Sequence, residues 1–244
     1  MSDTMRSLIF SAVLCLVCSL LLTAAATGLK GYQQENVELD RRRNLLKSVN
    51  LVAAGGDYSA EDIRRLYDAN IAEIAVDRSG RVVPAGEDTG VSLPVYLYQT
   101  GDAIQAYIIP INTRGLWGKI KGYMALESDG ATIAGFTVYQ HSETPGLGGE
   151  IEQRWFQENF VGKKIVGRYG DFVSVSVAKG VADTAVPEEK QMNYVDGISG
   201  ATLTGRFLTA GLKDILETYE PISVQFRGQR MLRMPQAAEK KTQP

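Results

Sequence analysis

The chain has 244 residues, of which 44% are hydrophobic, and a formal net charge of −2. This composition is enough for one globular domain with short appendages. The near-neutral charge excludes the basic surface that nucleic-acid binding requires. His141 is the only histidine, which excludes a multi-histidine metal site.

The N-terminal segment is strongly apolar. No charged residue occurs from Ser7 to Leu29, and about 20 apolar residues are enough to cross a bilayer as a helix. We therefore expect residues 1–30 to form a short cytoplasmic N-terminus and one retained transmembrane helix. The alternative is a signal peptide cleaved after the small residues 24–26.

Cys15 and Cys18 fall on one face of the expected transmembrane helix. A pair with this spacing is typical of metal or redox sites, but two thiols do not complete a site. The simpler interpretation is two small apolar residues that pack in the membrane.

Three further regions follow. We expect a linker region over residues 31–58, with a helix that ends before Gly55-Gly56, and then a folded domain over residues 59–220. A capping signal at Ser59 predicts the first helix of that domain. Beyond Pro221, the run from Arg227 to Pro244 is basic and polar, and we expect residues 221–244 to form a disordered tail.

The folded domain is predicted to be α+β, with a mostly antiparallel sheet and flanking helices. From Ile74 onward the apolar residues alternate, as in half-buried strands. The expected strands are 74–76, 82–83, 95–99, 103–111, 122–127, 132–140 and 172–177. A short helix is expected at 151–160 and a long one after residue 201. The buried face of the long helix is expected to consist of Leu203, Phe207, Leu208, Leu212, Ile215 and Leu216.

Two motifs stand out. The first is a loop rich in glycine and proline, His141-Ser142-Glu143-Thr144-Pro145-Gly146-Leu147-Gly148, whose backbone is able to approach a flat ligand closely. The second is Asp196-Gly197-Ile198-Ser199-Gly200-Ala201-Thr202, at the junction between a strand and a helix. Gly197 and Gly200 permit a tight turn, and Ser199 is the expected N-cap. The amide groups of such a helix start attract phosphate.

Together the motifs resemble those of the FMN-binding domain family. The resemblance extends from the apolar segment to the last helix, and it is greatest with C subunits of Na+-translocating NADH:quinone oxidoreductases. It is next greatest with G subunits of Rnf electron-transport complexes. In the family, the final threonine of the second motif carries FMN through a phosphoester bond, and the first motif lies beside the flavin ring.

The resemblance therefore implies a set of cofactor-binding residues around a covalent FMN on Thr202. The other implied residues are Asp196, Ser199, Gly200, Ala201, Leu203, Thr204, Glu143, Thr144, Pro145, Gly146, Leu147, Gly148, Trp117 and His141.

Several of these residues have two interpretations. Trp117 either stacks on the flavin or belongs to the core at a strand edge. His141 either tunes the flavin or is a hydrogen-bonded loop residue. Glu143 either binds the ribityl hydroxyls or shapes the loop. Asp196 and Ser199 either hold FMN or are recognised by the enzyme that attaches it.

The implied function is electron transfer within a membrane complex that oxidises NADH, reduces ubiquinone and exports Na+. The implied partners are a second flavin subunit, a membrane iron or iron–sulfur centre, and a flavin transferase. The resemblance places the protein in the bacterial inner membrane with its domain in the periplasm, whereas the basic residues after the span favour the reverse orientation. The alternatives are an Rnf subunit, an anchored structural subunit without flavin, and a stand-alone extracytoplasmic flavin carrier.

Overall fold

A computed structural model describes residues 2–53, 55–84 and 92–228. Contacts between Cα atoms divide the chain into two compact units, residues 1–41 and 42–244. Residues 229–244, which make up most of the expected C-terminal tail, lie outside the described part of the chain.

The first unit consists of the N-terminal part of helix α1 (Asp3–Ser48). This helix is long and apolar enough to cross a membrane, with a mean hydropathy of 2.6 over its most apolar window. Its side chains from Leu8 to Leu22 are exposed, as expected for a segment that contacts lipid. The sequence predicts a separate linker helix after residue 30, but the structure has one helix of 46 residues.

Cys15 and Cys18 are both exposed on α1. Within residues 2–53, 55–84 and 92–228, no group of three or more cysteine, histidine or carboxylate residues comes together to hold a metal ion. A metal site at this pair would therefore need further ligands.

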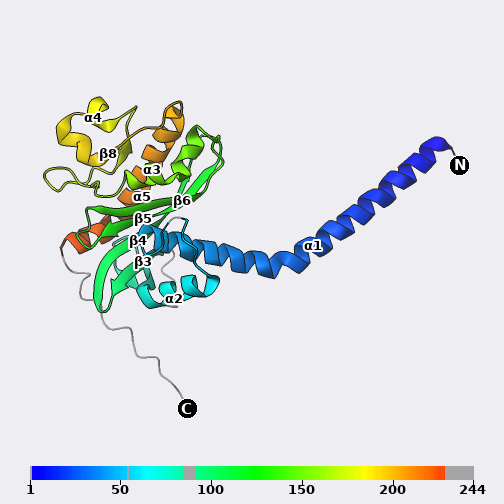
Figure 1. Cartoon of the computed structure of the whole chain (residues 1–244), viewed down its shortest axis with the longest axis horizontal. Helices are drawn as coiled ribbons and strands as arrows, with labels where there is room; N and C mark the ends of the chain where they lie inside the picture. Colours follow the sequence, from blue (N-terminus) through cyan, green and yellow to red (C-terminus); the bar gives the residue numbers. More distant parts are fainter. Residues whose placement is uncertain (1, 54, 85–91, 229–244) are drawn as a thin grey trace, which may run out of the picture. The chain divides into compact units, whose positions relative to one another are not determined.

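The second unit is built on a six-stranded antiparallel sheet with the order β2-β1-β3-β4-β5-β6 (Figure 1). The prediction of an α+β domain is confirmed. The strands are β1 (Ile71–Val76), β2 (Val82–Val83), β3 (Leu93–Thr100), β4 (Ala103–Arg114), β5 (Lys119–Glu127) and β6 (Ile133–Gln140).

Helix α2 (Ala60–Asn70) contacts β1 and β3. It begins with the predicted capping box: the Asp62 amide donates to Ser59 Oγ at 3.1 Å, and the Asp62 carboxylate accepts from the Ser59 amide. Ile63 and Tyr67 are its buried residues. In Figure 1, α2 and the long helix α5 lie on opposite sides of β3 and β4.

Helix α5 (Thr202–Arg227) packs on the sheet face formed by alternate residues of β4, among them Tyr107, Ile109 and Ile111. Its close approach depends on Gly211, because a Cβ there would lie 1.7 Å from Thr113 Oγ1. Of the predicted buried face, Leu208, Leu212 and Leu216 are buried and Phe207 and Ile215 are partly buried. Leu203 has an exposed fraction of 50%, so its predicted burial is wrong, because it lies on the surface side of the first turn of α5.

The disordered tail is expected to begin at residue 221, and that boundary is wrong. Helix α5 continues through Pro221 to Arg227, with Ile222, Ser223 and Phe226 buried. The Phe226 ring stacks on Tyr107 at 4.3 Å between centroids, and the Tyr107 hydroxyl lies 2.7 Å from Ser223 Oγ. This packing outweighs the helix-breaking tendency of proline.

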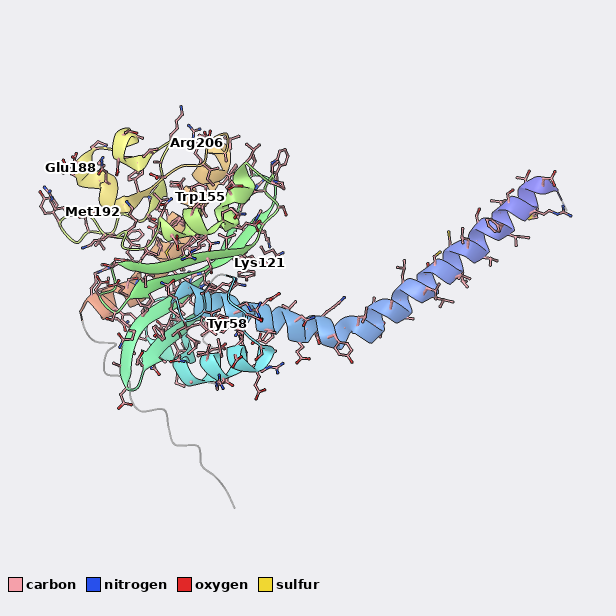
Figure 2. All side chains as sticks on the ribbon, viewed as in Figure 1. Tyr58, Lys121, Trp155, Glu188, Met192 and Arg206 are labelled. Carbon is pink, nitrogen blue, oxygen red and sulfur yellow. The ribbon has the colours of Figure 1, made fainter. Side chains whose placement is uncertain are left out.

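The remaining elements form a region with little regular structure. It comprises η1 (Gly148–Glu152), α3 (Arg154–Glu158), β7 (Ser176–Val177), α4 (Ala182–Ala185), η2 (Glu188–Asn193) and β8 (Tyr194–Val195). The predicted helix over 151–160 is therefore shorter than expected, and the predicted strand over 172–177 is limited to its last two residues. Strands β7 and β8 pair in parallel. Glu188 and Met192 mark η2 in Figure 2.

Candidate functional site

The glycine–proline loop contains a tight turn at its centre. The Leu147 amide donates to the Thr144 carbonyl at 3.1 Å, which closes a four-residue turn with Pro145 and Gly146 at its centre. Gly146 has φ +72°, the conformation that the third position of a type II turn requires. Proline and glycine therefore fix the shape of the loop, as the sequence predicts.

The second motif contains a turn of the same kind. The Ala201 amide donates to the Ile198 carbonyl at 3.1 Å, and Gly200 has φ +75°. Gly197 does not share this backbone conformation. It allows a close approach instead, because a Cβ there would lie 2.1 Å from the Ala178 carbonyl oxygen.

Ser199 is not the N-cap, so that prediction is wrong. The turn places Ser199 two residues ahead of the cap position, which Ala201 occupies, and no side chain caps α5. The first amide groups of an α-helix have no acceptor within the helix. In α5 these amide groups also have no capping side chain, and the positive end of the helix dipole lies at the same first turn.

The two threonines of this helix start differ sharply in accessibility. Thr202 is the first residue of α5 and is exposed, and Leu203 is half exposed. Thr204 has an exposed fraction of only 2%, and its hydroxyl donates to Glu143 Oε2 at 2.5 Å. Arg206 and Trp155 mark the side of the domain on which α5 begins in Figure 2.

Tertiary folding brings the two motifs into contact. A Cβ on Gly200 would lie 2.8 Å from Leu147 Cδ2, and a Cβ on Gly148 would lie 2.4 Å from Thr204 Oγ1. The glycine–proline loop therefore lies directly against the first turn of α5. Four consecutive exposed residues of the loop lie there: Thr144, Pro145, Gly146 and Leu147. Gly148, which follows them, is buried.

Trp117 belongs to a third segment at the same place, the connection between β4 and β5. Its amide donates to Glu143 Oε1 at 3.0 Å, and its side chain has an exposed fraction of 69%. The interpretation of Trp117 as a core residue is therefore wrong, because the tight connection turns the indole outward. A cavity of about 610 Å³ lies beside it, between this connection and the middle of α5, lined in part by Arg114, Lys119 and Asp214.

His141 is engaged within the loop. Its Nδ1 accepts a hydrogen bond from the Glu143 amide at 3.1 Å, and its Nε2 lies 3.1 Å from Glu152 Oε2. An Nδ1 that accepts carries no proton, so Nε2 is the donor to the carboxylate. Both ring nitrogens thus have partners in the chain. Glu152 was not predicted, since no sequence pattern links it to His141.

Asp196 is likewise occupied by the chain itself. Its Oδ1 accepts a hydrogen bond from the Ala182 amide at 2.7 Å, at the first turn of the short helix α4. It therefore joins the start of the second motif to the neighbouring irregular region.

The FMN-binding domain family matches residues 115–217, a range that contains all three segments. The chain is 34% identical over 234 residues to the C subunit of the Na(+)-translocating NADH-quinone reductase of Pseudomonas aeruginosa, and the match covers 84% of this chain and 88% of the relative. It is also 34% identical over 224 residues to the C subunit of the same reductase from Vibrio campbellii, covering 79% and 82% of the two chains.

The chain belongs to the family of C subunits of Na+-translocating NADH-quinone reductases.

Solved structures of this C-subunit family agree with the fold. The crystal structure of the C subunit from Parabacteroides distasonis matches with a TM-score of 0.68 and 31% identity, covering 80% of this chain and 96% of that chain. The structure of Shewanella oneidensis NqrC matches with a TM-score of 0.63 at 21% identity, covering 78% and 97% of the two chains, and supports the fold alone. The three segments at the start of α5 therefore lie within the FMN-binding domain of a reductase C subunit.

Proposed function

We propose that this C subunit is an electron-carrying flavoprotein whose FMN is attached to the Thr202 hydroxyl through a phosphoester bond. The observation that carries the proposal is the contrast between two neighbouring threonines. Thr202 is exposed at the uncapped start of α5, whereas Thr204 is buried and bonded to Glu143.

The residues present fit FMN. The free amide groups and the dipole of α5 suit a phosphate at its first turn. Leu147 and Leu203 have exposed fractions of 44% and 50% at that turn, and they offer apolar surface for a flat ring. Trp117, with an exposed fraction of 69%, lies on the β4–β5 connection that Glu143 joins to the loop. When bound, FMN supplies the capacity to take up and release electrons.

Attachment through the phosphate leaves the redox-active ring chemically unmodified. The chain then influences the flavin through the polarity and hydrogen bonds of the surrounding loop. A covalent link also prevents loss of the cofactor. This would matter on the periplasmic side of the membrane, where we place the domain.

We infer that a Mg-dependent flavin transferase attaches the group from FAD. The Thr202 hydroxyl oxygen bonds to the phosphorus of the FMN half, the bond between the two phosphates breaks, and AMP leaves as the hydroxyl proton is lost. An exposed hydroxyl is needed for this reaction, and only Thr202 of the two threonines offers one. Ser199, exposed beside it, is available for recognition by the transferase.

In the complex, we propose that the chain is anchored in the bacterial inner membrane by α1, with its N-terminus in the cytoplasm. Electrons would arrive from a membrane iron or iron–sulfur centre and pass to a second flavin subunit, in a complex that oxidises NADH, reduces ubiquinone and exports Na+. The names of the relatives support this complex over an Rnf complex.

Fluorescence of the chain after denaturing electrophoresis tests the attachment. Wild-type protein from cells that contain the transferase should give a band that fluoresces under ultraviolet light, and Thr202→Val should give a dark band of equal protein content. Thr204→Val is the matched control and should fluoresce. A fluorescent Thr202→Val band would contradict the site, and a dark wild-type band would favour a structural subunit without flavin.

A further inference from the structure

Glu143 connects three segments that are distant in the sequence. It has an exposed fraction of 4%, and its carboxylate accepts from the Trp117 amide at 3.0 Å and from the Thr204 hydroxyl at 2.5 Å. Its own amide donates to His141 Nδ1. One side chain therefore ties the β4–β5 connection, the glycine–proline loop and the first turns of α5 together.

Two glycines provide the space for this carboxylate. A Cβ on Gly115 would lie 2.5 Å from Glu143 Oε1, and a Cβ on Gly148 would lie 2.8 Å from Oε2. Any other residue at these positions would displace the carboxylate or its partners. The group is thus enclosed by the chain, and a ligand bound at the surface does not reach it.

Joining segments through a buried carboxylate has a free-energy cost. Burial of a charge costs free energy that apolar residues of similar volume do not cost. Hydrogen bonds to a charged acceptor are directional and stronger than neutral ones, so they fix one arrangement of their donors. The arrangement fixed here is that of exposed Trp117 and Leu147 relative to exposed Thr202.

We propose that Glu143 is a positioning residue for the flavin: it holds the β4–β5 connection with Trp117 and the loop with Leu147 in place relative to the helix turn that carries Thr202, without touching the cofactor. This rests on the proposed function. Because the surroundings of the ring set its potential, loosening the Glu143 contacts changes the midpoint potential of the bound flavin.

Thr204→Val is the direct test. Valine has nearly the volume of threonine and lacks the hydroxyl donor. In the detergent-solubilised full chain without flavin, we expect amide hydrogen exchange at Trp117 and across residues 141–149 to accelerate by about 10- to 100-fold, the loss expected for one hydrogen bond to a charged group. In the flavin-loaded chain, the flavin should stay attached and its midpoint potential should differ from wild type by more than the spread of replicate titrations.

Two controls separate positioning from general loosening. Thr209→Val, on the same helix, removes a different contact, in which Thr209 Oγ1 accepts from the Val177 amide at 2.9 Å. It should accelerate exchange at Val177 and leave residues 141–149 and the potential unchanged. Thr204→Ser keeps the donor and should restore wild-type exchange and potential, so a serine variant as altered as the valine variant overturns the proposal.

The possible outcomes are distinct. Wild-type exchange in Thr204→Val would show that the contact holds nothing in place. Faster exchange with an unchanged midpoint potential would show that Glu143 has only a structural role, and it would overturn the proposal that Glu143 positions groups for the flavin. If the wild-type chain carried no flavin, the proposed function would fail, and exchange in the flavin-free chain would still decide whether Glu143 holds the three segments.

Discussion

The Leu147 side chain lies directly over Gly200: a Cβ added to Gly200 would come within 2.8 Å of Leu147 Cδ2. The two motifs therefore meet at a position where the contact and the positive φ both favour glycine. Each motif contributes a turn with a glycine of positive φ, and the Leu147 side chain covers the turn of the second motif. The shape of the site therefore depends on a contact between two loops as well as on the hydrogen bonds within each.

Gly200→Ala should destabilise the domain more than Gly146→Ala. Both glycines have positive φ, and an alanine there costs about 1–2 kcal/mol. Only at Gly200 does the new Cβ also meet a neighbour, since nothing lies within 4 Å of a Cβ on Gly146. Urea unfolding followed by tryptophan fluorescence measures the difference, and equal losses would show that the contact with Leu147 yields freely.

Gly148→Ala should loosen the glycine–proline loop. Its Cβ would lie 2.4 Å from Thr204 Oγ1 and 2.8 Å from Glu143 Oε2, and such overpacking costs about 1–3 kcal/mol. The free energy of unfolding should fall accordingly. Gly162→Ala serves as the comparison: its Cβ would meet no neighbour within 4 Å, and its φ of +78° is strained only for the new alanine, at a cost of about 1–2 kcal/mol. A Gly148→Ala chain as stable as wild type would contradict the expectation.

Phe226→Ala should destabilise the domain by about 3–5 kcal/mol, because it removes a buried ring that stacks on Tyr107. Val224→Ala, two residues earlier and half exposed, should change stability by less than about 0.5 kcal/mol. Thermal unfolding of both variants measures this. Equal, small effects would mean that the last turns of α5 are as dispensable as the sequence predicts.

Stability should fall at alkaline pH. Burial raises the pKa of both Tyr107 and Tyr219 above the usual value for tyrosine. Because the folded chain holds these phenols protonated, their contribution is complete below about pH 10 and is lost as the pH rises further. Urea unfolding between neutral and alkaline pH should show this decline, and Tyr107→Phe should reduce its slope. A Tyr107→Phe variant as pH-dependent as wild type would contradict the assignment.

The sequence alone determined much of the local structure. The apolar run of α1, the alternation of the strands and the Ser59 capping box each depend on residues close together in the chain, and short-range rules describe them well. The Pro145-Gly146 and Gly200 turns were predictable for the same reason. The resemblance to the FMN-binding domain family rests on these local motifs.

Only the tertiary structure decided which side chains are accessible. Trp117 faces outward because of the β4–β5 connection, and α5 continues past Pro221 because Phe226 packs on Tyr107 of β4. The motif already singles out Thr202 over Thr204, but only the structure shows that Thr202 is exposed while Thr204 is buried and hydrogen-bonded to Glu143, 61 residues earlier. Burial and long-range hydrogen bonds depend on segments that only folding brings together, and no local sequence pattern specifies which distant segments meet.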